Sequence, residues 1–448
     1  MKQIAVLLTL VGSLLLGACS GESALPVATG KATITAVNAI YGSPTLNFQI
    51  EERSLGTVAY KSITTSASYD DIEYTFNFDV FFAGENAITR IASQSIDMVA
   101  DQQYTLLASG TLESTVLTLW ETSERDFADT DTVFQARFAH TSDTLQNIDV
   151  YFALEGIAPA AGEAAATLSF GEISAPIDFE TGDYVVTLTT SGDPADILFQ
   201  SKPSTILQRS NLIITPFDGD ANDTSPIVVR ALSPLGRAFT FHDPLYPSTL
   251  QFLHASQDLG SSDVYDDEAL TSQVLTDHSF KQLTADAPID AGEYQFFYTP
   301  AGDTTVVTVE TTVGLVDGAH FRIIATGTGG GYSTTNIALD RRSINTAGKL
   351  NLYSSSSNFN FIDLYLVNSG ESIEGVAPFR SGVISRISNP SDAVNAGSYD
   401  VYVTSFADAE TIAGPLPLDV AIGDVIDMVI FDTADTAQLE IVVYPAAP

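Results

Sequence analysis

The chain of 448 residues is long, strongly acidic and 45% hydrophobic. It can therefore bury several cores, and its length predicts roughly three or four domains. Its 18 basic and 56 acidic residues give a formal net charge of −38. Because nucleic-acid affinity comes mainly from Lys and Arg that neutralise phosphates, this charge argues strongly against DNA or RNA as a partner. It also disfavours direct contact with anionic lipid headgroups.

The N-terminus has the pattern of an export signal. Lys2 supplies a positive charge, an apolar run covers residues 4–16, and Leu-Gly-Ala-Cys ends at Cys19. The run is too short to span a bilayer as a mature helix. The pattern resembles the bacterial lipoprotein signal, in which residues 1–18 are removed and acyl chains such as palmitate are attached to the cysteine. The resemblance implies a lipid-anchored protein, and Ser20 fits sorting to the outer membrane.

After the signal, the sequence predicts a short tether followed by strands. Cys19 is the only cysteine, so an internal disulfide is excluded. Residues 19–30 are small and polar and predict a flexible tether. From there on, short runs rich in Val, Ile, Thr, Tyr and Phe alternate with Gly, Asp, Asn and Pro, which predicts strands almost everywhere. No segment has the periodicity of an amphipathic helix.

One motif recurs four times and organises the chain. It places a polar residue at the end of one strand and a second polar residue nine positions later, in the next strand. The first members of the four motifs lie 102, 114 and 100 residues apart. A repeat of this length is a small domain, because solenoid and propeller units span roughly 20–50 residues. The four pairs are Asn38 and Asn47, His140 and Asp149, His254 and Asp263, and Ser354 and Asp363.

A second motif follows each pair and predicts the kind of domain. It reads acid or amide, x, Gly, x, Tyr, and it ends at Tyr184, Tyr294 and Tyr399, while the first repeat offers Tyr74 without the Gly. It resembles the tyrosine corner of immunoglobulin-like sandwiches, in which the Gly permits a turn and the hydroxyl bonds to nearby backbone. Each repeat has room for about seven strands. The chain is thus predicted to be all-β, with four tandem immunoglobulin-like antiparallel sandwiches.

We place the four sandwiches near residues 31–126, 132–243, 248–345 and 348–448. The joints would be 126–131, 243–247 and 341–348. If the domains followed one another in a row, at about 34 Å for each domain of 100 residues, the row would be roughly 130 Å long.

The repeats also resemble the bacterial "domain of unknown function 4397" family. Its members pair an Arg-x-x-His-Ala-Ser strand with a Val-Asp-Val-Tyr strand, followed by Gly-x-Tyr. The second and third repeats match through Arg137, His140, Asp149, His254 and Asp263. The fourth repeat keeps the Asp but has Ser in place of the His, and the first repeat, which keeps neither, is the most divergent. The resemblance implies a sandwich fold and no established activity.

The His and Asp pairs have two interpretations. As acid–base pairs they would belong to a catalytic site. However, strand alternation puts His140 on the face of Ala136 and Phe138, whereas Asp149 lies opposite the face of Val150. The preferred interpretation is therefore structural, with each His or its substitute satisfying backbone groups at a strand end.

A calcium loop is the one metal candidate. Its oxygen ligands at alternate positions would be Asp218, Asp220, Asn222 and Asp223. The loop departs from the EF-hand template, because Asp223 stands where Gly is required and Val229 where Glu is expected. A turn between strands is the preferred interpretation, with no cofactor expected unless calcium binds there.

These observations predict a non-catalytic, lipid-anchored protein of the bacterial outer membrane, facing the cell surface or the periplasm. It would serve as a spacer or as a binding module for an unknown protein or polysaccharide. The alternative is a calcium-assisted adhesin that recognises surface polysaccharide or protein, and the least favoured hypothesis is a hydrolase with its site at a domain joint.

Overall fold

The computed structural model describes residues 27–82, 88–123, 125–406 and 408–444. Within these ranges the chain forms 35 strands and no helix, so the predicted all-β class is confirmed. The described residues accordingly include no helix that could cross a membrane. Cys19, the expected signal and most of the expected tether lie outside these ranges.

The strands form eight sheets, which pack in pairs as four sandwiches. The first sandwich contains β1 (Lys31–Asn38), β2 (Leu46–Ile50), β3 (Arg53–Val58), β4 (Ser62–Ile63), β5 (Ala67–Asp70), β6 (Glu73–Phe81), β7 (Ile88–Asp97), β8 (Gln102–Gly110) and β9 (Thr115–Ser123). The second contains β10 (Val133–Phe138), β11 (Ile148–Leu154), β12 (Ala166–Leu168), β13 (Ile177–Glu180), β14 (Gly182–Thr190), β15 (Ile197–Gln200), β16 (Ser204–Ile206), β17 (Asn211–Asp218), β18 (Ile227–Ser233) and β19 (Arg237–Phe241).

The last two sandwiches have eight strands each. The third contains β20 (Ser248–His254), β21 (Ser262–Tyr265), β22 (Gln273–His278), β23 (Ala287–Ile289), β24 (Gly292–Pro300), β25 (Val309–Leu315), β26 (His320–Thr326) and β27 (Ser333–Ala338). The fourth contains β28 (Gly348–Ser354), β29 (Phe361–Asn368), β30 (Arg380–Ile384), β31 (Asp392–Val394), β32 (Gly397–Ser405), β33 (Thr411–Val420), β34 (Val425–Asp432) and β35 (Leu439–Tyr444).

The strand order is shared by the four sandwiches and differs from that of immunoglobulin domains. In the third, one sheet has the order β23-β20-β26-β27 and the other β22-β21-β24-β25. The first strand of each sandwich pairs in parallel with a late strand, as β20 does with β26, and the other strand pairs are antiparallel. Immunoglobulin sheets join strands A, B, E and D against C, F and G, so the first two strands share a sheet there and not here.

Alternation along the motif strands builds the cores, as the sequence predicted. Phe134, Ala136 and Phe138 of β10 are fully buried, and they meet Ile148 and Val150 of β11 from the facing sheet. These side chains share one face because successive residues of a strand point to opposite sides. Equivalent strands build the other three cores.

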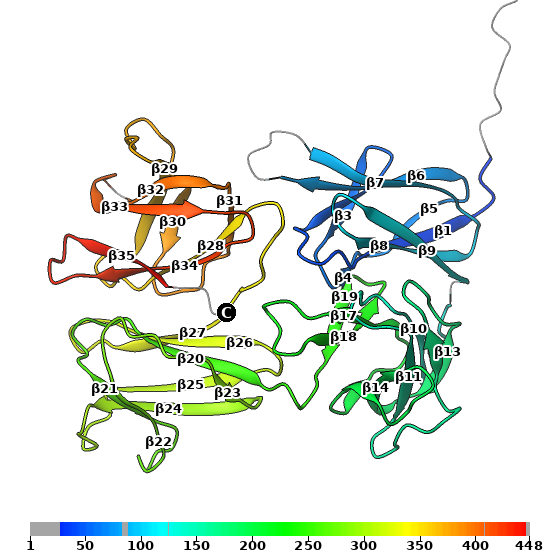
Figure 1. Ribbon diagram of the computed structural model, residues 1–448, viewed down its shortest axis with the longest axis horizontal. Helices are drawn as coiled ribbons and strands as arrows, with labels where there is room; N and C mark the ends of the chain where they lie inside the picture. The colour runs from blue at the N-terminus through cyan, green and yellow to red at the C-terminus, as the bar shows by residue number, and fades with distance from the viewer. Residues whose placement is uncertain (1–26, 83–87, 124, 407, 445–448) are drawn as a thin grey trace, which may run out of the picture.

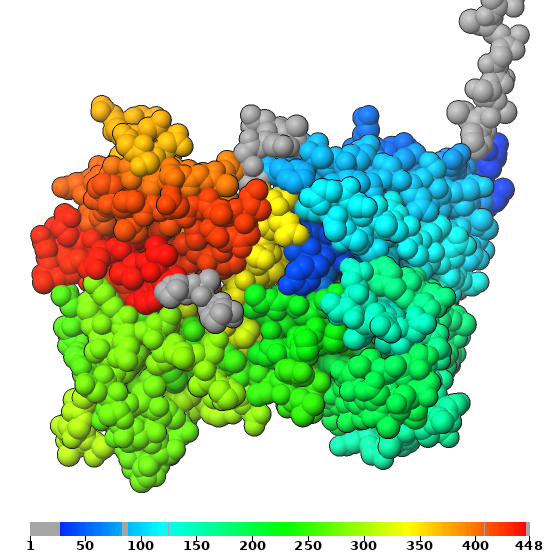
Figure 2. Space-filling model, viewed as in Figure 1, coloured from blue at the N-terminus to red at the C-terminus, as the bar shows by residue number. Residues whose placement is uncertain are grey.

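The four sandwiches form a two-by-two block rather than the expected row. Figure 1 shows the first above the second on one side, and the fourth above the third on the other. The space-filling view in Figure 2 shows that the domains of each pair meet along a broad surface. Local sequence patterns do not predict this arrangement, because it depends on side chains of different domains that meet across the interfaces.

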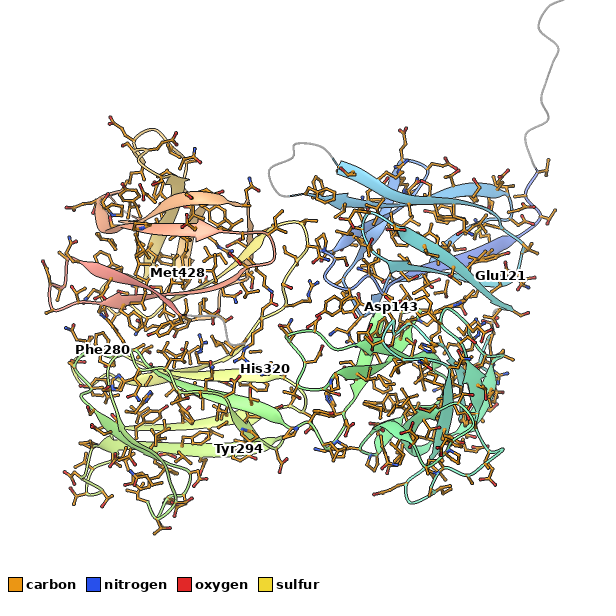
Figure 3. The ribbon with its side chains drawn as sticks, in the orientation of Figure 1. Glu121, Asp143, Phe280, Tyr294, His320 and Met428 are labelled. Atoms are coloured by element: carbon orange, nitrogen blue, oxygen red, sulfur yellow. The ribbon has the colours of Figure 1, made fainter. Side chains whose placement is uncertain are left out.

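Both pair interfaces are hydrophobic and use the same sheets. Between the first two sandwiches, Leu107 and Trp120 pack against Phe217 and Leu232. The Trp120 indole N–H also donates to the Gly171 carbonyl at 2.8 Å. Between the third and fourth, the corresponding cluster consists of Leu253, Ala255, Ile324, Tyr353, Val429, Phe431 and Tyr444, with Phe280 at its edge. Figure 3 shows Phe280 on the side of the third sandwich that faces the fourth.

Candidate functional site

The two motif histidines are fully buried, and each forms a hydrogen bond with a backbone carbonyl. His140 Nε2 lies 2.7 Å from the Gln146 carbonyl oxygen, and His254 Nε2 lies 2.6 Å from that of Gly260. Each Nε2 must therefore carry the proton and donate it to the carbonyl. Both Nδ1 atoms are buried without a partner. Burial lowers the pKa of both imidazoles, so they are neutral near pH 7.

In the first and fourth repeats, Asn38 and Ser354 stand in place of the histidine and also make buried hydrogen bonds. Asn38 donates to Ser43 Oγ at 2.9 Å and accepts from the Ile40 N–H. Ser354 shares a hydrogen bond of 2.7 Å with Ser385 Oγ. Both are fully buried. This position thus requires a polar side chain that forms hydrogen bonds with the buried polar groups around it.

The motif aspartates accept hydrogen bonds from backbone N–H groups and form none with the histidines. Asp149 accepts from the Gly192 N–H at 2.8 Å and from Thr167 Oγ1 at 2.6 Å. Asp263 accepts from the Gly302 N–H at 2.9 Å, and Asp363 accepts from the Gly382 N–H at 2.7 Å. The acid–base pairs considered from the sequence are therefore not assembled.

The tyrosines form the expected corners. Tyr184, Tyr294 and Tyr399 donate their hydroxyls to the carbonyls of Glu180, Asp290 and Asn395, at 2.8, 3.0 and 2.9 Å.

The glycine of the corner is not explained by the turn geometry expected from the sequence. Neither Gly292 nor Gly397 has a positive φ, so neither is needed for a turn. A Cβ at these positions would lie 3.4 and 3.3 Å from the rings of Tyr294 and Tyr399. A Cβ would therefore be in ordinary contact with the Tyr294 ring and only slightly tight against the Tyr399 ring, so contact with the ring does not by itself require a glycine.

The calcium-like loop already holds a cation from another domain. Lys61 of the first sandwich inserts its ammonium between Asp220 and Asp223, with 2.9 Å to Asp220 Oδ2. Side-chain exposure is 9% for the lysine and 4% and 19% for the two aspartates, so the group is largely buried. Asp218 turns away from it and accepts from Thr144 Oγ1 at 2.5 Å. Among the described residues, no group of three or more His, Cys, Asp or Glu is placed to hold a metal ion.

The same loop ties the two pairs together. Asn222 donates to Asp340 Oδ1 at 3.0 Å and accepts from the Arg342 N–H at 2.9 Å. These two residues belong to the segment that joins the third and fourth sandwiches. Arg342 in turn donates to the Ser43 carbonyl of the first sandwich at 2.6 Å. The first two sandwiches and the segment between the third and fourth thus meet around residues 218–223, which we call the central loop.

A cavity of about 290 Å³ lies between the third and fourth sandwiches. On its polar side Arg322 donates to Asp427 at 2.9 Å, and Asn351 donates to the same carboxylate at 2.9 Å. Its other side is apolar, with Leu339 and Met428 among the lining residues. The cavity combines fixed hydrogen-bonding groups with an apolar wall, which is the usual make-up of a small-molecule site.

Comparison with protein families identifies the repeats. The model of a family described as "Domain of unknown function (DUF4397)" matches residues 32–151 and 248–365, more than half of the chain. The protein belongs to the DUF4397 family. Each match covers almost all of one sandwich or the whole of it, the first strand of the next sandwich and part of that sandwich's second strand. The first sandwich is included although it lacks both the His and the Asp of the DUF4397 motif.

Other comparisons add little to the DUF4397 assignment. No curated protein matches the chain. Among solved structures, "The Bacillus anthracis TIE protein" is similar at 11% identity with a TM-score of 0.15. That alignment covers 91% of this chain and 69% of the other.

One position shared by the second and fourth repeats of this chain was missed from the sequence. Asp218 and Asp432 end equivalent strands, β17 and β34, and each is 78 residues after the motif residue, His140 or Ser354. Asp432 accepts from Ser356 Oγ at 2.6 Å and from the Ser357 N–H at 2.7 Å, and Asp218 accepts from the equivalent loop. The shared spacing of 78 was the signal that could have found the position. The same spacing would also have indicated that Asp218 has a structural role and is not part of a calcium loop.

Proposed function

We propose that this protein is a non-catalytic, lipid-anchored protein of the bacterial outer membrane that acts as a rigid interaction module. The proposal rests on one observation, the hydrogen bonds that the motif side chains form. His140, Asp149 and Tyr184 of the second sandwich each bond to the backbone of their own domain. Their counterparts in the third sandwich, His254, Asp263 and Tyr294, do the same. Such groups stabilise loops and are not free to act on a substrate.

The block also suits an interaction module better than a long spacer. Two domains span its longer direction where a row would have four, so its reach is about half of the roughly 130 Å expected for the row. Loops at the ends of the sandwiches remain available for partners.

The proposed anchor sets how far the block stands from the membrane. Asp71 of the first sandwich accepts from the N–H groups of Thr29 and Gly30 at 2.7 and 2.9 Å, which fixes the start of the domain. Thr29 is ten positions after Cys19, so ten residue-to-residue steps join them. Fully extended, they span at most about 36 Å.

Replacement of the lipidated cysteine tests the anchor. We expect Cys19→Ser to move the protein from the membrane fraction to the soluble fraction of the cell envelope, because acyl chains attach only to the thiol and the new amino group of the cysteine. Ser23→Ala, in the same segment, should leave the protein membrane-bound. Membrane retention of the Cys19→Ser protein would contradict the anchor. Protease treatment of intact cells then tells which side of the membrane the domains face.

The cavity between the third and fourth sandwiches favours a second candidate, an adhesin that binds one unit of a surface polysaccharide. The fixed polar groups around Arg322 and Asp427 suit ring hydroxyls, and the apolar wall suits the face of a sugar ring. The calcium that the sequence suggested for an adhesin is not needed in this candidate, and Lys61 lies between Asp220 and Asp223 of the central loop.

Blocking the cavity tests the adhesin. Ser388 lines it and is exposed, so Ser388→Trp should fill its entrance and abolish glycan binding on an array without changing the melting temperature. Ser372→Trp, on an exposed loop of the same sandwich, is the matched control. Equal glycan binding by both variants, or no binding by the wild type, would remove this candidate.

A further inference from the structure

Two buried histidines lie side by side in the third sandwich. His254 and His278 are 0% and 2% exposed, and their rings are 5.7 Å apart. Each Nε2 donates its proton to a backbone carbonyl, that of Gly260 at 2.6 Å and that of Gln282 at 2.9 Å. Both Nδ1 atoms are buried without a partner. A second proton on either ring would therefore enter a buried site that offers it no acceptor.

Both histidines are bonded to the loop that follows His278. This loop, residues 279–282, is called the docking loop below. The Gln282 carbonyl accepts from the His278 ring and also from the His254 N–H, at 3.1 Å. The Lys281 N–H donates to the His254 carbonyl at 2.8 Å. The position of the docking loop therefore depends on both histidines.

The docking loop contacts the fourth sandwich. The Phe280 ring lies 5.6 Å from the ring of Phe431, on the side of the third sandwich that faces the fourth (Figure 3). The Tyr444 hydroxyl donates to the Lys281 carbonyl at 2.8 Å. The Lys281 ammonium also forms an ion pair with Glu440. A displacement of the docking loop would remove all of these contacts between the two sandwiches.

No carboxylate of the described chain stabilises a charge on either histidine. Asp277 precedes His278, and Asp263 lies on the neighbouring strand β21, where it accepts from the Asp277 N–H at 2.8 Å. Among the titratable groups, only the His254 imidazole acts on the charge of His278, and it disfavours that charge. A protonated His278 is therefore stable only when its ring reaches water.

Of the two histidines, His278 has the easier route to water. His254 ends β20, which lies between β23 and β26 in its sheet, whereas His278 ends β22, an edge strand. The end of an edge strand moves at the cost of fewer backbone hydrogen bonds than the end of a central strand.

We propose that protonation of His278 releases the docking loop and undocks the third sandwich from the fourth. The ring leaves its buried site for water, and its hydrogen bond to the Gln282 carbonyl breaks. Because the docking loop directly follows the ring, the contacts of Phe280 and Lys281 with the fourth sandwich are lost. The two sandwiches are thus docked at neutral pH and separate in acid.

The size of the effect follows from the two states of His278. In the docked state burial lowers its pKa to about 4, whereas the released imidazole regains the ordinary pKa of about 6.5. The stabilisation of docking is therefore complete above pH 6.5 and is lost as the pH falls towards 4. Between pH 7 and pH 5 the equilibrium constant for docking should fall about 20-fold.

The first pair of sandwiches supplies the design of a reporter. Trp120 lies opposite Thr105 in the pair β8 and β9, as Tyr444 lies opposite Asp427 in the pair β34 and β35. Each donates to a carbonyl of the neighbouring sandwich. Trp120→Phe combined with Tyr444→Trp places the single tryptophan between the third and fourth sandwiches. Phe280→Trp, with the same Trp120→Phe change, serves as the reporter if Tyr444→Trp does not fold.

Urea titrations of the reporter protein at pH 7 and pH 5 test the proposal. Tryptophan emission measures undocking, and circular dichroism measures unfolding of the domains. At pH 5 the emission transition should move to lower urea and separate from the circular dichroism transition. His278→Leu should remove most of this shift, because leucine occupies the position in the second sandwich, at Leu168, and does not titrate.

Glu440→Gln is the matched control. It removes the other group of this interface that titrates in acid, and it should weaken docking at both pH values but keep the shift. An equal shift in His278→Leu, or transitions that coincide at pH 5, would overturn the proposal. Coincident transitions would mean that acid unfolds the third sandwich without undocking it first.

Discussion

Replacing Lys61 by methionine is expected to destabilise the docked block by about 3–5 kcal/mol. The substitution keeps the length of the side chain but leaves Asp220 and Asp223 buried at the central loop without a cation. Burial already raises the pKa of Asp223, and Lys61 opposes that rise. Loss of the lysine should therefore undock the first two sandwiches before the domains unfold. Urea titrations followed by the emission of Trp120 and by circular dichroism measure the two events separately.

Two comparison proteins identify the cause of the Lys61→Met effect. Lys31→Met breaks an exposed ion pair with Asp70, whose side chains are 66% and 50% exposed, and it should cost less than about 1 kcal/mol. The triple variant Lys61→Met, Asp220→Asn, Asp223→Asn removes the uncompensated charges and should recover most of the stability. A loss in Lys61→Met no greater than that in Lys31→Met would refute the role of the central loop.

Acid is expected to destabilise the third sandwich selectively between pH 6.5 and 4. His278 is 2% exposed, and burial lowers its pKa to about 4. Because the folded pKa lies below that of the unfolded chain, the stabilisation is complete above pH 6.5 and is lost as the pH falls towards 4. The shift corresponds to a loss of about 3 kcal/mol. Its neighbour His254, with rings 5.7 Å apart, has a pKa lowered in the same direction.

The repeats themselves supply the matched variant for the acid effect. The position of His278 is held by Leu168 in the second sandwich and by Val383 in the fourth, as the shared strand pairing shows. His278→Leu should therefore fold and should lose less stability than the wild type when urea midpoints at pH 7 and pH 4.5 are compared. The carboxylates that titrate in this range are common to both proteins and cancel in the difference. An identical pH dependence of the two proteins would contradict the assignment.

Features set by local pattern could be predicted from the sequence. Alternation of apolar residues predicted the strands and the core faces, as Phe134 and Phe138 show. The corner tyrosines could be predicted because donor and acceptor are four residues apart in the chain, as in Tyr294 and Asp290.

Features set by distant contacts could not be predicted. The strand order depends on parallel pairs such as His254 with Ala325, which share no local signal. The sequence predicts a possible calcium site at the central loop, whereas the cation found there is Lys61, which is 162 residues away from Asp223 in the chain. The two-by-two block follows from such contacts, so the row was the natural but wrong expectation from sequence alone.

Small-angle X-ray scattering of the soluble fragment 25–448 tests the central claim, that the four sandwiches form one block. With about 13 Å for the radius of gyration of each domain and about 34 Å between neighbours, the block predicts an overall radius of gyration of about 27 Å. A row of the same domains predicts about 40 Å. A value near 27 Å, unchanged by added calcium or chelator, supports the block held by the central loop. A value near 40 Å would contradict it.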